Sequence, residues 1–236
     1  MSISTADPQL ITDPLHSPFP IPWQWILETQ ATVAAGNQSS ADVCRSPALN
    51  NGRHQYAAYS RIQLALRPQL QESQVTSVLF VENLQTGILS TVMARSPLAP
   101  QAFQAVEGND AAGLISLLIP VSWSADGQRL LARQFEGFFN SGVMSDFAVV
   151  WDAKTQRSIT LQPNIEAEYS HAILLGWSEQ YAEDVLFQTG VMGEETWPIW
   201  RVSPSGDTNL ARENHGVVYG DLLSPAWFGS DGEFNI

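Results

Sequence analysis

One short phrase recurs along this chain of 236 residues and limits what the chain can fold into. Each copy joins a strand-like run to a large apolar side chain and a turn of small polar residues. The copies lie at 46–52, 119–127, 173–178 and 224–232. Because repeated units of this kind bury their apolar faces on one another, the repeat determines architecture before it says anything about chemistry.

The distances between the copies set the size of the unit. Trp123, Trp177 and Trp227 are separated by 54 and 50 residues, and Leu49 precedes Trp123 by 74 because the interval holds an irregular stretch at 96–113. A unit of about 40–50 residues accommodates four short strands. The sequence therefore predicts an all-β chain of four-stranded antiparallel units, three complete and a fourth that stops inside its second strand. The expected strands are 55–64, 75–82, 88–93, 114–123, 129–135, 147–151, 157–161, 172–177, 184–188, 199–202 and 208–211.

The phrase has a physical rationale. Asp126 and Gly127 suit a tight strand reversal, because both residue types tolerate the backbone angles that such a turn needs. The preceding Trp123 is large enough to fill the wedge between neighbouring sheets, and its indole N–H can donate a hydrogen bond there.

These phrases resemble the repeat of TolB-like, PD40-type β-propellers, in which a strand ending in tryptophan leads into a Ser-Pro-Asp-Gly turn. The segment 121–132 follows this pattern closely, and 149–152 matches a later strand of the unit. The first copy has Leu49 in place of tryptophan, and the third lacks the Asp-Gly turn. The resemblance covers roughly residues 46–236. It implies an incomplete or open β-propeller-like stack that serves, as WD40-like repeats do, as a platform for protein binding.

The number of units raises the question of how the stack is closed. Propellers close with about 4–8 blades, and a shorter array exposes sheet edges and apolar faces. Three solutions are open. The half unit 224–236 folds back onto the first unit, an N-terminal helix caps an open face, or two chains associate into about six or seven sheets. We expect an open stack capped by the helix, with self-association and a non-propeller β-sandwich as alternatives.

The N-terminal region has a different composition. Residues 1–20 hold four prolines and are expected to form an extended, mobile arm. Residues 21–45 are expected to contain a short helix at 22–35, begun by a proline and ended by a glycine, and then a polar loop over 37–42. The repeat domain is expected to occupy 46–236.

Charge and cysteine content exclude several classes of partner. The chain has 24 acidic and 11 basic residues and a net charge of −13, which repels phosphate backbones and anionic membrane surfaces. We therefore expect no nucleic-acid partner and no membrane insertion. The single cysteine, Cys44, excludes an internal disulfide and fits a reducing compartment. The expected location is cytoplasmic.

Two sets of apolar side chains are candidates for binding a partner protein. One lies beside the N-terminal prolines. The other lies on the loops 136–142 and 190–197, which follow the second strands of their units and should project to the same side as an apolar patch. The alternative for both sets is packing against the protein's own sheets. The candidate partner-binding residues are Trp23, Trp25, Phe138, Phe139, Met192 and Trp197.

The sequence offers little for catalysis. It lacks a nucleophile elbow, a phosphate loop and a dinucleotide fingerprint, and its histidines lack metal-ligand spacing. We expect no catalytic residues, no metal and no cofactor. The acidic pairs Glu183–Asp184 and Glu194–Glu195 leave a hydrolase open, provided that carboxylates with raised pKa values converge in a cleft. The prediction is a non-enzymatic interaction or scaffold module, possible as a homodimer, with a hydrolase or a structural subunit of a larger complex as alternatives.

Overall fold

The computed structural model describes residues 13–92, 112–166, 168–224, 226–230 and 232–234. These residues form one helix, α1 (Trp23–Gly36), a short 3-10 turn at Leu70–Glu72, and strands for the rest of the regular structure. The protein is therefore mostly β, as the sequence predicts. No helix among the described residues is long and apolar enough to cross a membrane.

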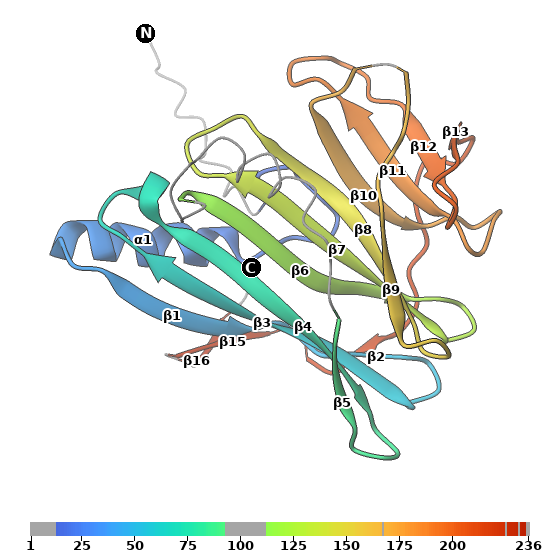
Figure 1. The fold of residues 1–236 in the computed structure, drawn as a ribbon, viewed down its shortest axis with the longest axis horizontal. Coiled ribbons are helices and arrows are strands. Elements are labelled where there is room, and N and C mark those ends of the chain that lie inside the picture. The colour runs from blue at the N-terminus through green and yellow to red at the C-terminus, as the bar shows by residue number, and fades with distance from the viewer. Residues whose placement is uncertain (1–12, 93–111, 167, 225, 231, 235–236) are drawn as a thin grey trace, which may run out of the picture.

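Three antiparallel four-stranded units follow one another along the chain (Figure 1). In the first unit the first strand is interrupted, so that β1 and β2 both pair with β3. The first unit comprises β1 (Ser40–Arg45), β2 (Leu49–Asn50), β3 (Tyr56–Leu66), β4 (Gln74–Asn83) and β5 (Leu89–Val92). The second comprises β6 (Leu114–Trp123), β7 (Arg129–Phe138), β8 (Met144–Asp152) and β9 (Arg157–Leu161). The third comprises β10 (His171–Trp177), β11 (Val185–Gly190), β12 (Ile199–Val202) and β13 (Thr208–Leu210).

The units stack so that one face of each lies on the opposite face of the next. Side chains at alternate positions of a strand point to opposite faces. In β7, Leu130 and Ala132 share a core cluster with Ala58 of the first unit. The intervening Leu131 shares a second cluster with Leu174 of the third unit. Each seam is thus formed by opposite faces of consecutive units, although a short parallel pairing of β4 with β6 also joins the first two units at one end.

A third core cluster joins the helix to the sheets. The buried Ile26 and Val33 of α1 pack with Ile62 of β3 and Leu117 of β6, and Ile173 of β10 reaches the same cluster. The helix therefore covers sheet faces that would otherwise be exposed, as expected for a cap.

The hairpins that open each unit show which positions correspond. Their closing backbone hydrogen bonds run from Asn51 to Tyr56 (3.0 Å), from Ser124 to Arg129 (2.7 Å) and from Ser178 to Asp184 (2.9 Å). The residue before each donor therefore holds the same place in its unit. Trp123 and Trp177 hold it as expected, and both are buried in the seams. In the first unit Asn50 holds it, so the alignment of Leu49 with Trp123 is wrong by one residue.

One later segment of the chain pairs with all three of these positions. We call residues 216–222 the strap; they include β14 (Asp221–Leu222). Its pairs are Val217 with Trp177, Tyr219 with Trp123, and Asp221 with Asn50. Because alternate strap residues meet successive units, the strap fixes the order and spacing of the whole stack.

The fourth copy of the phrase does not form an equivalent unit. Its strands β15 (Trp227–Gly229) and β16 (Gly232–Phe234) make a hairpin that pairs antiparallel with β1. Trp227 lies in the helix-side core, away from the seams that hold Trp123 and Trp177. The C-terminal half unit thus folds back onto the first unit, one of the three solutions expected.

Two expectations about the N-terminal region are wrong. Ser40–Arg45 is a strand, although 37–42 was expected to be a loop. The sequence of this strand has no apolar alternation, because Cys44 is the one side chain in it that is buried. Residues 13–20 do not form a free arm, because Asp13 and Leu15 are 1% and 3% exposed. The rest of the expected arm, 1–12, lies outside the described residues.

Candidate functional site

Most of the expected partner-binding residues pack inside the molecule. The ring of Trp23 stacks on Phe139, with centroids 5.9 Å apart, and Phe139 is only 6% exposed. Trp25 and Trp197 pack, partly buried, against the same cluster. The structure therefore brings aromatic side chains from α1 and from both loops together, but as part of a core rather than as an open patch.

The other two residues of this set differ in exposure. Phe138, at the end of β7, is half-buried, and its N–H donates to the carbonyl of Val143 across the turn. Met192 is 62% exposed in the loop between β11 and β12. Only Met192 presents a largely free apolar side chain to a partner.

A network of buried charges holds the N-terminal segment to the second unit. Arg133 of β7 donates from Nη1 to Asp13 Oδ2 (2.6 Å) and from Nε to Asp146 Oδ1 (2.7 Å). Its Nη1 also donates to the carbonyl of Phe19 (2.6 Å). The second oxygen of Asp146 accepts the N–H of Leu174 in the third unit (3.0 Å). One arginine thus links the N-terminal segment, the second unit and, through Asp146, the third.

These carboxylates have the convergence that a hydrolase needs, but they lack access. Burial raises the pKa of Asp146 to about 6, although the charge of Arg133 opposes this shift. The side chains of Arg133 and Asp146 are 0% exposed and that of Asp13 is 1% exposed. Arg133 occupies the oxygens of both carboxylates, and solvent does not reach them. This arrangement therefore holds the N-terminal segment to the second unit and is not suited to hydrolysis of a substrate.

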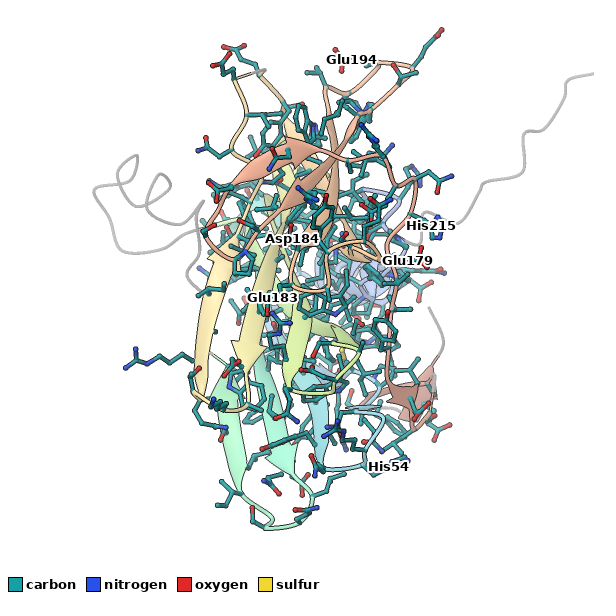
Figure 2. All side chains as sticks on the ribbon, turned by 90° about the vertical axis from the view of Figure 1, so that its right-hand side faces the viewer. His54, Glu179, Glu183, Asp184, Glu194 and His215 are labelled. Atoms are coloured by element: carbon teal, nitrogen blue, oxygen red, sulfur yellow. The ribbon has the colours of Figure 1, made fainter. Side chains whose placement is uncertain are left out.

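Of the acidic pairs singled out in the sequence, Glu183, Asp184 and Glu194 lie on the outer side of the third unit (Figure 2). Glu183 pairs with Arg129 (3.1 Å) while remaining 69% exposed. Burial raises the pKa of Asp184, and its pairing with Arg201 (3.1 Å) lowers it in part. Glu194 accepts the N–H of Val191 within its own loop (3.0 Å). These carboxylates are engaged separately and do not point at one another.

The remaining reactive residue types form no site among the described part of the chain. No three His, Cys, Asp or Glu side chains there are placed to hold a metal ion. His54 and His215 lie far apart in Figure 2, His54 in its lower part and His215 beside Glu179. Burial, aided by the charge of Asp42, raises the pKa of the Cys44 thiol to about 12, so this thiol is not ionised near neutral pH.

The first unit has one face that no other unit covers, and we call it the open face. The pairs that place its side chains in rows are Arg45 with Arg61, Arg61 with Val78, and Tyr59 with Phe80. Phe228 of the C-terminal hairpin extends the row beside Arg45. The open face comprises Val43, Arg45, Tyr59, Arg61, Val78, Phe80 and Phe228.

This face combines exposed apolar groups with exposed arginines, and the exposed Glu233, which pairs with Phe228, lies at its edge. Val43, Val78 and Phe228 are 43%, 45% and 40% exposed. The rings of Tyr59 and Phe80 stack with centroids 5.5 Å apart. The guanidinium of Arg45 lies 4.1 Å from the Tyr59 ring centroid, a cation–π contact. A depression of about 270 Å³ lies between Val43, Arg61 and Phe80.

The corresponding face of the second unit is covered by a neighbouring unit. By the alignment of the hairpins, Ala132 and Val149 correspond to Tyr59 and Phe80. Ala132 and Val149 are 1% and 0% exposed, because the first unit covers them. Among the described residues, the open face is therefore the one surface of its kind in the three units that lacks a neighbouring sheet.

Sequence reasoning missed the open face. Residues 59, 61 and 63 alternate with buried positions, and that alternation is typical of a solvent-facing side of a strand. Composition could have indicated this face, because large apolar side chains share that side of the strands with the arginines of β1 and β3.

Comparison with known proteins adds no assignment. No protein-family model matches the sequence, and no curated protein matches it significantly.

Proposed function

We propose that this protein is a non-enzymatic interaction module: an open, propeller-like stack of three units whose open face binds another polypeptide. The supporting observation is the difference between equivalent faces. Ala132 and Val149 are buried under the preceding unit, while Val78 of the open face is 45% exposed. A large exposed apolar surface with aromatic side chains and arginines has the composition of protein interfaces.

The stack supports this role because the open face is built on the paired strands β1, β3 and β4. The strap ties the three units together, and the buried Arg133 network holds the N-terminal segment against them. A partner would therefore meet a preformed surface and lose little free energy in ordering it. A hydrolase is less well supported, because the converging carboxylates are enclosed with Arg133.

Capture of partners with matched variants tests this proposal. Val78→Asp places a charge in the open face, and Val143→Asp places one on a valine of similar exposure, 50% against 45%, in the turn between β7 and β8. The wild type and Val143→Asp are expected to capture the same proteins from a native extract, and Val78→Asp is expected to lose at least one. If Val78→Asp and Val143→Asp capture identical sets, the open face is not a binding surface.

A further inference from the structure

The two ends of the stack differ in chemistry, and the difference bears on what covers the open face. Within the molecule, each seam joins one face of a unit to the opposite face of the next. Among the described residues, no preceding unit packs on the open face, and no following unit packs on the outward face of the third unit at the other end of the stack. The two unmatched faces are therefore of the opposite kinds that meet in each internal seam.

The outward side of the third unit carries an aromatic ring and carboxylates. Tyr181 is 50% exposed and lies over the guanidinium of Arg201, 3.3 Å from its Cζ to the ring centroid. Arg201 is already paired with Asp184. The exposed Glu179 lies beside Tyr181 in the same loop, and exposed Glu195 lies in the loop after β11. The available charge on this side is negative.

Acidic side chains are concentrated at the third-unit end of the stack. The first unit, counted as residues 40–92 with the strap and hairpin residues 216–234 that pair with it, holds four arginines against six carboxylates, and residues 114–161 hold four basic and four acidic side chains. Residues 171–215 hold seven carboxylates against two arginines. Arg45 and Arg61 of the open face therefore have the opposite charge to the acidic end of a second copy and attract it locally.

We propose that the open face is covered by the acidic end of a second copy of this chain, which continues the stack head to tail. The proposal rests on the proposed function, because it names the occupant of the same face. Arg45 and Arg61 would lie against carboxylates such as Glu179, and Val78 and Phe80 would be covered by the outward face of the partner's third unit. Such an interface joins two different surfaces, so two copies can close a ring of both contacts.

Complementation between two variants tests this arrangement. A face variant carries Arg61→Glu with Val78→Asp, and an end variant carries Glu179→Lys with Glu195→Lys. All four side chains are exposed, so both chains are expected to fold. Sedimentation of the full-length chain, alone and in an equal mixture, measures association relative to the 25.9 kDa monomer.

The wild type is expected to form species of at least twice the chain mass. Each variant alone should associate at least about a hundredfold more weakly, and the mixture should form 1:1 complexes within about tenfold of wild-type affinity, because one intact face meets one intact end. Formation of the mixed complex also shows that both variants are folded.

Two results would overturn the inference. If the end variant alone associates as the wild type does, the open faces pair with each other instead. If the wild type is monomeric at every concentration, no second copy covers the face. In that second case, loss of a captured protein from Val78→Asp would leave the proposed function standing with a different partner, and no such loss would remove both.

Discussion

Arg133 shows how a single side chain can hold distant parts of this chain together. It is fully buried, and its bonds reach Asp13, which lies 120 residues earlier, and Asp146 on the adjacent strand. In the sequence, Arg133 stands between Ala132 and Gln134, and a charged residue in a strand is typical of a solvent-facing position. Its burial could not be predicted, since the partner that makes it possible lies in a proline-rich segment that was expected to be free.

Removing this arginine should leave two buried carboxylates without a counter-charge. Arg133→Met is expected to lower the free energy of unfolding by about 3–5 kcal/mol, the usual cost of breaking a buried ion pair on one side. Urea unfolding measures it, with the exposed Arg157→Met as control, which should stay within about 0.5 kcal/mol of the wild type. Equal stabilities of the two variants would mean that the network contributes little.

The raised pKa of Asp146 predicts a specific pH dependence. Its folded pKa of about 6 exceeds the ordinary 3.8, so between these values the folded state retains a proton that the unfolded state has lost. The free energy of unfolding therefore decreases as pH rises through this range. Between about pH 5 and pH 7.5 the wild type should lose about 1 kcal/mol that Asp146→Asn does not lose.

Asp152 provides the control for that measurement. Although desolvation opposes the shift, hydrogen bonds from Thr155 lower the pKa of Asp152. This carboxylate is ionised in both states above about pH 5, so Asp152→Asn should keep the wild-type pH dependence. If Asp146→Asn also keeps it, Asp146 does not titrate in this range.

At the scale of elements, strand composition and turn residues were sufficient for most of the sheet structure. The strands β6, β9 and β12 have the bounds expected from sequence, and α1 begins and ends within a residue of expectation. The strap was missed, because it makes isolated bridges and a two-residue strand, and its sequence has no strand pattern. Its pairing depends on three distant positions that no local signal reveals.

The glycines of the strap should be necessary for its close approach. Gly220 has a positive φ of 107°, and a Cβ there would lie 2.7 Å from the carbonyl oxygen of Asn50. Gly220→Ala is expected to destabilise the protein by about 1–3 kcal/mol and to speed amide exchange at Val217 and Tyr219. Gly142→Ala, with nothing within 4 Å, is the control and should change neither quantity. Unchanged exchange in Gly220→Ala would show that the strap is not held as described.

At the scale of the whole molecule, the repeat predicted three stacked units but not which face remains open. That result depends on the order of stacking and on where α1 and the C-terminal hairpin lie. The hairpin pairs with the edge strand β1, and α1 covers the face that bears Ile62, so neither covers the face that bears Val78. The face that bears Val78 therefore keeps exposed apolar side chains, although α1 covers another face of the stack.

Association through this face should depend on salt. Because Arg45 and Arg61 of the open face attract the exposed carboxylates of the acidic end, raising the salt concentration from about 0.05 M to about 0.5 M is expected to weaken association severalfold. The readout is the sedimentation of the wild type in both buffers. Stronger association at high salt would contradict the charge-based pairing and would indicate a purely apolar contact.

The central claim is that a second copy of this chain covers the open face, and hydroxyl-radical footprinting tests it at the side chains themselves. Purified wild-type protein is labelled at increasing concentration, and oxidation of Tyr59, Phe80 and Phe228 is compared with that of Val143. The account predicts that oxidation of the three aromatic residues decreases with concentration while that of Val143 stays constant. Unchanged oxidation of the aromatic residues at every concentration would contradict it.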